Sequence, residues 1–183
     1  MKSQLSKTMA KKRTIELTIA GYTFSLKNLQ VHDDMSDETT CFSAELYCDG
    51  KKIARCNNDG HGGETNVYIV GACDLKSAVE IGAPLVAIKN FRDEEYEKLM
   101  NERMKMYNPN YDGEPWVQLW TDEHLCDTLM EKQAAWDDAV KQLKKIAKQH
   151  PKLNVFFNGD RVYVASKDTP IEEGFEDVTE YVR

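Results

Sequence analysis

Hydrophobic and polar residues alternate through much of the first seventy positions, which is the pattern of strands with one buried face. Residues 15–26 predict a hairpin that turns at Ala20-Gly21 and places Leu17 opposite Phe24. Residues 66–70 predict one more short strand. The N-terminal half of the chain is therefore expected to form an antiparallel sheet.

A second hairpin is predicted around the Asp-Gly pair at 49–50, because Asp-Gly between two alternating segments favours a two-residue turn. This turn places Leu46 opposite Ile53 on the apolar face. On the other face it brings Glu45 near Lys52, and a cross-strand charge pair of this kind contributes about 0.2–1 kcal/mol.

Helical periodicity dominates the middle of the chain. Asp74 is expected to cap a short helix that ends near residues 82–84, and Asp93 is expected to cap a second helix. The pattern leaves residues 85–91 undecided between strand and helix. The longest helix is expected over 121–149, with an apolar stripe made of Leu125, Leu129, Trp136, Val140, Leu143 and Ala147.

Alternation returns after Pro151, where a turn at 159–160 places Phe157 opposite Val162. Together these elements predict an α+β fold. In this fold an antiparallel sheet of hairpins, from the N-terminal half and the C-terminal hairpin, packs with two or three helices, one of them long.

The 183 residues carry 24 Lys+Arg and 31 Asp+Glu, a formal charge of −7. Residues 1–13 hold five basic and no acidic side chains, whereas residues 168–183 hold six acids and one arginine. We therefore expect a basic flexible arm (1–13), a single domain (14–167) and an acidic C-terminal tail (168–183). The arm is either a solvated tail or a contact for phosphate. Lysines also crowd the last turns of the long helix, where they suit the negative end of its dipole: Lys141, Lys144, Lys145 and Lys148.

The overall acidity argues against a general nucleic-acid binder and leaves open a partner that is itself basic. The sequence contains no run of about 20 apolar residues, so we expect no membrane-spanning helix. The five cysteines are an odd number with no export signal ahead of them, which predicts reduced thiols and a cytoplasmic location.

His124 lies two residues from Cys126, but such neighbours do not share a helix face, so we discount a catalytic dyad. The common catalytic motifs are absent from the sequence, and we expect no enzyme activity, metal or cofactor.

The least usual segment is a loop rich in glycine and polar residues that follows the second hairpin. Its glycines allow positive φ, and its Asn and Asp side chains can bond to their own backbone. One interpretation is a ligand or metal loop that uses Asp59, His61 and Glu64. The other is a tight turn without catalytic function. The residues of interest are Asn58, Asp59, Gly60, His61, Gly62, Gly63 and Glu64.

The stretch from Phe42 to Gly63 contains the motif F-x-A-x-L-Y-x-D-G-K followed by N-D-G-H-G-G. It resembles a set of small proteins encoded by phages and other mobile elements, a set that includes type II-A anti-CRISPR proteins. In these proteins a helical segment and a short C-terminal hairpin follow the motif. The resemblance covers about residues 14–167, and its specific part is residues 42–63.

The resemblance implies an inhibitor that works in the cytoplasm of a bacterial host and binds the RNA-guided DNA endonuclease of type II CRISPR systems, in its guide-loaded form. Such an inhibitor blocks either target DNA engagement or cleavage, without catalysis. That nuclease holds nucleic acid in basic channels, and acidic side chains would complement them. The partner-binding residues expected on this basis are Asp33, Asp34, Asp37, Glu38, Asp93, Glu94, Glu95, Glu172, Glu173, Glu176 and Asp177.

Three alternatives remain open. The protein could be a metal-dependent enzyme that uses the N-D-G-H-G-G loop. It could be an accessory protein that sequesters a small immune-signal nucleotide with this loop and Arg55. It could also be a structural or assembly protein with partner contacts alone.

Overall fold

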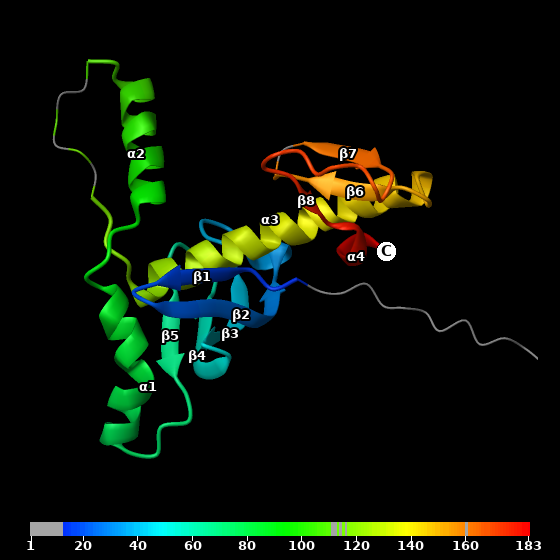
Figure 1. Cartoon of the computed structure of the whole chain (residues 1–183). Coiled ribbons are helices and arrows are strands. Elements are labelled where there is room, and N and C mark those ends of the chain that lie inside the picture. Colours follow the sequence, from blue (N-terminus) through cyan, green and yellow to red (C-terminus); the bar gives the residue numbers. More distant parts are fainter. Residues whose placement is uncertain (1–12, 111–112, 114, 116, 160) are drawn as a thin grey trace, which may run out of the picture. The chain divides into compact units, whose positions relative to one another are not determined.

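The computed structural model describes residues 13–110, 113, 115, 117–159 and 161–183 (Figure 1). The chain divides into two compact units. We call residues 15–130 the N-terminal unit, and residues 131–183 with Arg13 and Thr14 the C-terminal unit. Sheets and helices occur in both, so the predicted α+β class is confirmed. The single domain predicted over 14–167 stays a prediction, and most of the predicted basic arm lies outside the described residues.

Five antiparallel strands form the sheet of the N-terminal unit, in the order β1-β2-β3-β4-β5 (Figure 1). The predicted first hairpin is confirmed, because Leu17 pairs with Phe24 and Ile19 with Tyr22. The short strand predicted at 66–70 is also present and forms one edge of the sheet. The bounds are β1 Glu16–Ile19, β2 Tyr22–Val31, β3 Phe42–Cys48, β4 Lys51–Asn58 and β5 Asn66–Ile69.

The predicted register of the β3–β4 hairpin is wrong in one place. Leu46 lies opposite Ala54 instead of Ile53, because the pairing shifts by one residue after Leu46. This bulge allows both Ile53 and Ala54 to be buried, which strict alternation would not allow. The predicted contact between Glu45 and Lys52 is confirmed as an ion pair, which lowers the pKa of Glu45.

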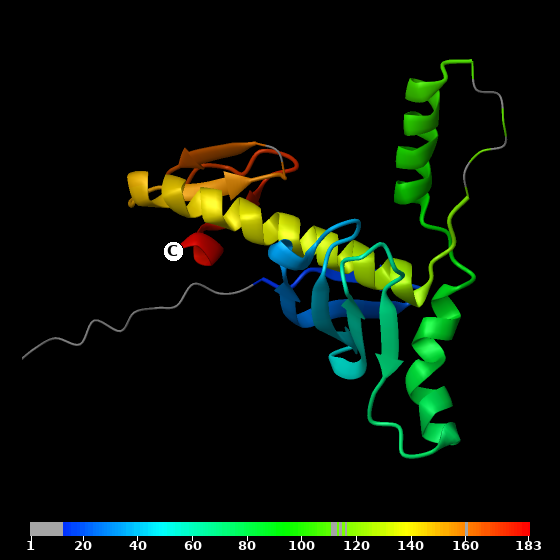
Figure 2. The same ribbon diagram turned by 180° about the vertical axis from the view of Figure 1, so that it is seen from behind.

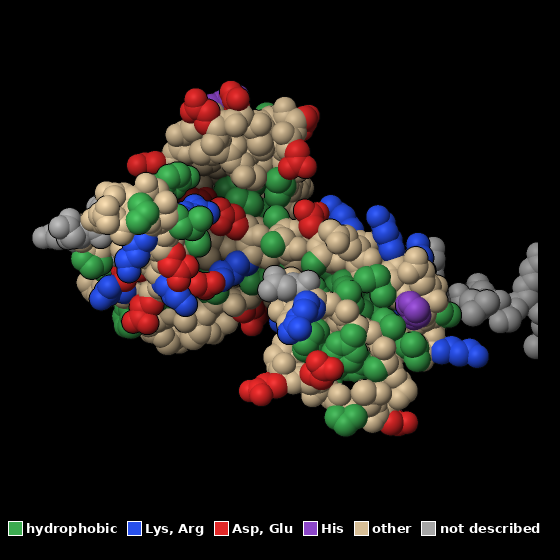
Figure 3. All heavy atoms as spheres, turned by 90° about the horizontal axis from the view of Figure 1, so that it is seen from above, with side chains coloured by type: hydrophobic (Ala, Val, Ile, Leu, Met, Phe, Trp, Pro, Cys, Tyr) green, Lys and Arg blue, Asp and Glu red, His purple; other side chains and the backbone are tan. Residues whose placement is uncertain are grey.

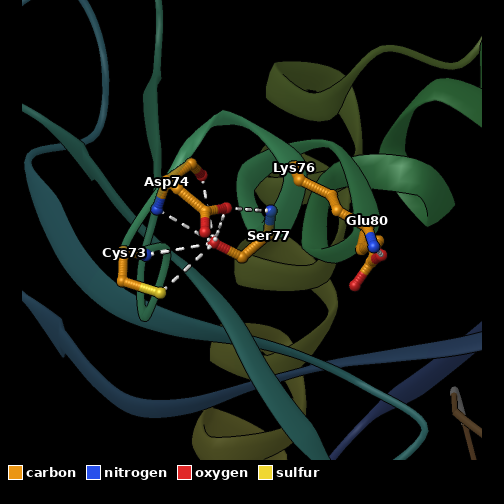
Figure 4. A network of polar contacts seen from close by, with 5 residues as sticks. All are labelled: Cys73, Asp74, Lys76, Ser77 and Glu80. Atoms are coloured by element: carbon orange, nitrogen blue, oxygen red, sulfur yellow. Dashed lines mark hydrogen bonds and ion pairs between the residues drawn. The ribbon is translucent and has the colours of Figure 1, made fainter.

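Helix α1 (Leu75–Ile88) begins at a capping box, as Figure 4 shows. The Asp74 carboxylate accepts from the Ser77 backbone N–H at 2.7 Å, and the Ser77 hydroxyl accepts from the Asp74 backbone N–H at 3.1 Å. The predicted end near residues 82–84 is wrong, because the helix continues through Pro84. Leu85 and Ile88 are both buried beyond the proline. Burying two such side chains contributes about 3–6 kcal/mol, which outweighs a cost of about 3 kcal/mol for an internal proline.

Two further helices match their predictions. Helix α2 (Glu94–Tyr107) starts at Asp93, whose side chain accepts from the Tyr96 backbone N–H at 3.0 Å. Helix α3 (Asp122–Gln149) is the long helix and belongs to both units. Its first turns bury Leu125 and Leu129 against the sheet of the N-terminal unit (Figure 2). Among the helices that the structure describes, none has the length and apolar character needed to cross a bilayer.

The C-terminal unit contains a three-stranded sheet in the order β7-β6-β8. The bounds are β6 Asn154–Phe157, β7 Val162–Ala165 and β8 Glu176–Asp177, followed by helix α4 (Thr179–Val182). The predicted pairing of Phe157 with Val162 is confirmed. Residues 168–183, expected as a tail, include β8 and α4. The physical reason is that Val178 and Val182 are buried beside Leu143 and Val155, within an otherwise acidic segment.

Candidate functional site

The side chain of Asn58, at the end of β4, connects two loops of the N-terminal unit. Its Oδ1 atom accepts from the Thr39 hydroxyl at 2.8 Å and from the Gly60 N–H at 2.9 Å. Its Nδ2 atom donates to the Gly63 carbonyl at 2.9 Å and lies 3.3 Å from the Thr65 hydroxyl. Asn58 is buried, so these contacts replace the hydration that it loses. We call residues 32–41 and 58–65 the joined loops.

Gly60 supplies a second connection between the joined loops. Its carbonyl oxygen accepts from the backbone N–H groups of Asp37, Glu38 and Thr39 at 2.9–3.3 Å. Its φ of +89° belongs to the region that glycine tolerates best. A Cβ atom there would overlap the Met35 carbonyl and lie 2.9 Å from the Cys41 Cβ atom. Position 60 therefore requires glycine for both its conformation and its close contacts.

The joined loops present acidic side chains to solvent. Asp33 and Asp34 belong to a 3-10 turn (η1, Asp33–Met35). The backbone N–H groups of Asp37 and Glu38 then donate to the Gly60 carbonyl. His61, Gly62 and Gly63 are also exposed. Six exposed carboxylates thus come from two segments that are far apart in the sequence: Asp33, Asp34, Asp37, Glu38, Asp59 and Glu64.

The first turns of α3 extend this acidic surface. Burial raises the pKa of Glu123, and so do the negative charges of Glu64, Asp122 and Asp127. Glu123 therefore lies close enough to Glu64 for the two carboxylates to repel each other. Asp127 accepts from the Thr65 hydroxyl at 2.6 Å, and burial raises its pKa. These α3 residues could not be found from the sequence, because only the folded chain brings residue 127 beside residue 65.

The other acids expected in the N-terminal unit have different surroundings. Asp93 is buried, and its second carboxylate oxygen lies 2.9 Å from Nε2 of His124. It therefore connects α2 to α3 inside the unit and is not part of the exposed surface. Glu94 and Glu95 are exposed on the first turn of α2. Both belong to a different segment from the joined loops.

The acids expected in the C-terminal unit fall into two pairs. Glu172 and Glu173 are exposed. Glu176 forms an ion pair with Arg13 at 2.6 Å, and the Arg13 guanidinium lies 4.8 Å from the centre of the Trp136 ring. Asp177 accepts from the Asn154 amide at 2.7 Å and from the Thr179 N–H at 2.9 Å. Glu176 and Asp177 therefore have partners within their own unit.

The described side chains offer little that resembles a catalytic centre. In the described ranges, no three His, Cys, Asp or Glu side chains are grouped so that they could hold a metal ion. Asp59 accepts from the His61 backbone N–H at 3.2 Å, which is the geometry of a local turn. The Cys126 thiol is buried, and its hydrogen bond with Cys56 and its burial both raise its pKa. Such a thiol is a poor nucleophile, because the reactive form is the thiolate.

A groove of about 340 Å³ lies between β5 and α1, which are neighbours in Figure 2. Its lining is mainly aliphatic and includes Val67, Ile69, Val79 and Val86. The two charged side chains in the lining, Lys89 and Asp122, lie 3.6 Å apart as an ion pair. The groove therefore has apolar walls and no cluster of groups suited to acid–base chemistry.

Comparisons of the chain with protein-family models, with curated proteins and with solved structures find no match.

Proposed function

We propose that the chain is a non-catalytic inhibitor that binds the guide-loaded DNA endonuclease of type II CRISPR systems in the bacterial cytoplasm. The proposal rests on the resemblance of residues 42–63 to anti-CRISPR proteins and on the acidic surface of the joined loops. The observation that carries it is the double connection through Asn58 and Gly60, which holds the acidic loop against the N-D-G-H-G-G loop.

Within this proposal the motif has a structural role and a contact role. Asn58 and Gly60 are buried and hold the loops in place, whereas His61, Gly62 and Glu64 are exposed and free to contact a partner. A loop whose side chains bond to their own backbone is rigid before binding. A rigid surface loses less conformational entropy on association than a flexible one.

Electrostatics favours a basic partner for this surface. Type II nucleases hold guide and target in positively charged channels and read a short DNA motif with arginines. Exposed carboxylates that face such a channel raise the association rate and hinder the entry of DNA, which is itself an anion. The predicted step of inhibition is therefore target engagement, which precedes cleavage.

The first experiment is a pull-down with a guide-loaded type II nuclease, with and without target DNA, together with a cleavage assay. Three variants separate the acidic groups: D33N/D34N/D37N/E38Q, E94Q/E95Q and E172Q/E173Q. We expect the first to weaken binding and inhibition most, because its acids belong to the joined loops. Equal inhibition by the wild type and all three variants would contradict the charge-based mechanism.

Two assays separate the alternative functions. Metal analysis of the purified protein tests the enzyme alternative, and a bound metal that is needed for biological activity would favour it. Calorimetry against a panel of cyclic nucleotides tests the sequestration alternative, which predicts heat on titration. Our proposal predicts neither result.

A further inference from the structure

The second half of α3 carries a face of exposed lysines: Lys141, Lys144, Lys145 and Lys148, which we call the lysine face. At 3.6 residues per turn, these positions fall within about 100° of the helix circumference. Figure 3 shows Lys and Arg side chains gathered along this part of the molecule. Residues 139–159 contain five lysines and no Asp or Glu, in a chain whose net charge is −7.

The direction of the lysine face is determined by packing. Leu143 and Ala147 are buried in the core of the C-terminal unit, and Val140 and Ile146 pack against the same core. These residues occupy the opposite side of α3, so the lysines must point to solvent. The helix therefore presents its positive charges from a rigid, anchored backbone.

The helix dipole does not account for the lysine face. Its effect is confined to the last turn, and Lys148 is the basic residue of that turn. Lys141 and Lys144 lie one to two turns earlier, so the interpretation given for them from the sequence is insufficient. Like charges four residues apart, such as Lys141 and Lys145, also repel one another. The fold therefore carries an electrostatic cost on this face.

Neighbouring carboxylates compensate little of this charge. Lys141 pairs with Asp138 at 2.8 Å, and both side chains are more than two-thirds exposed. Lys144, Lys145 and Lys148 form no ion pair with any residue that the structure describes. Three cations without such a pair, beside the paired Lys141 on a packed helix, form an arrangement that proteins use to neutralise phosphates.

We infer that the lysine face binds the phosphate backbone of double-stranded nucleic acid. From Lys141 to Lys148 the helix rises about 10 Å. One strand of a duplex places about three phosphates along the same length. The spacing of the lysines therefore matches a regular anionic array better than it matches the scattered acids of a protein surface.

The mode of binding follows from the same residues. Residues 137–149 contain no aromatic side chain on which an unpaired base could stack. Lysines contact phosphates as point charges and carry no information about sequence. Binding is therefore independent of sequence and strongly dependent on salt. It does not rest on the proposed inhibitor function, which concerns the acidic surface of the N-terminal unit.

The test uses the full-length protein without any nuclease. Fluorescence anisotropy measures its binding to a labelled 20-base-pair DNA duplex and to an RNA duplex of the same sequence, from 50 to 200 mM salt. The variant is K144Q/K145Q/K148Q. The matched control is K51Q/K98Q/K105Q, which makes the same charge change at exposed lysines of the N-terminal unit. Residues 1–13 are unchanged in every sample, so their contribution cancels.

We expect the wild type to bind duplex and the lysine-face variant to lose at least tenfold in affinity at 50 mM salt. The slope of log affinity against log salt should become shallower by about 2–3, because each lost phosphate contact removes about 0.9. The control should stay within about twofold of the wild type. Binding of either duplex supports the inference, and the ratio of the two affinities shows whether the lysine face prefers B-form DNA or A-form RNA.

Three results would overturn the inference. These are a wild type that binds neither duplex, a lysine-face variant that binds as well as the control, and poly-glutamate that competes as well as unlabelled duplex. Competition by poly-glutamate would mean that the lysine face binds any polyanion and is not selective for nucleic acid. Circular dichroism of each variant verifies that the helices are intact.

Discussion

The hydroxyl of Thr39 donates to the Oδ1 atom of Asn58 at 2.8 Å, and this bond joins two loops that are 19 residues apart in the sequence. The same Oδ1 atom caps the turn at Gly60, so one buried side chain organises both loops. The acidic surface therefore depends on a residue that has no charge and little exposure. Disrupting Asn58 should affect the surface without removing any carboxylate.

Replacing Asn58 with alanine should lower the free energy of unfolding by about 2–3 kcal/mol. The reason is that the substitution leaves Thr39, Gly63 and the Gly60 N–H without a buried partner. Chemical denaturation measures this change. The control is N57A, at the exposed neighbouring position, which should cost less than about 1 kcal/mol. Equal losses for the two variants would contradict the central role of Asn58.

Alanine at position 60 should destabilise the protein by about 3 kcal/mol, because positive φ and the overlap with Met35 both oppose a Cβ atom. G21A separates these two causes. Gly21 also has positive φ but nothing near its Cβ position, so G21A should cost about 1–2 kcal/mol. G63A should be close to neutral, because its nearest neighbour lies 3.9 Å away. Thermal denaturation of all three should give this order, and any other order would refute the steric argument.

Substituting Pro84 with alanine should raise the free energy of unfolding by about 1–3 kcal/mol, because proline inside a helix lacks a backbone donor. A83G, one residue earlier at an exposed position, should lower it by about 1 kcal/mol if the helix is continuous there. Both changes are measured by urea denaturation. A neutral A83G would indicate that α1 ends before residue 83.

Acid should weaken the anchoring of α2 through Glu97. The pKa of Glu97 lies below its ordinary value of 4.5. The causes are a hydrogen bond from Arg92, a hydrogen bond from the Gln118 N–H and the positive charge of Arg92. A carboxyl with a lowered folded-state pKa stabilises the fold above its unfolded-state pKa. That contribution is therefore present above about pH 4.5 and is lost as the pH falls through the lowered value.

Denaturation between pH 3 and pH 7 should therefore show a steeper acid loss for the wild type than for E97Q. The control is E94Q, an exposed neighbour on the same turn, which should keep the wild-type pH profile. A profile of E97Q identical to that of the wild type would show that the pair contributes nothing to folding.

Local patterns were sufficient to predict most of the fold. Two hairpin turns, the caps at Asp74 and Asp93, and the long helix all depend on signals within a few residues. The failures depend on contacts that are distant in the sequence. Ile53 and Ala54 are consecutive and both buried, which simple alternation along a strand does not predict. Pro84 is tolerated inside α1 because Leu85 and Ile88, which follow it, are buried.

The candidate site was predictable only in part. Its two loops are visible as an acidic segment and a glycine-rich segment, but no local pattern shows that Asn58 bonds to Thr39. The burial of Asp93 was also not predictable, because His124 approaches it from a helix that starts 29 residues later. Acidic residues that look equivalent in the sequence therefore divide into exposed groups and structural ones.

The most direct test of the proposed function is the affinity of the protein for guide-loaded type II nuclease, measured by biolayer interferometry. The wild type is compared with D33N/D34N/D37N/E38Q and with E16Q/E80Q/E102Q/E131Q, which neutralises four exposed acids outside the joined loops. We predict that the first variant binds at least tenfold more weakly, mainly through a slower association rate, and that the second stays within about threefold of the wild type. Equal affinities for the two variants, or no binding by the wild type, would contradict the account.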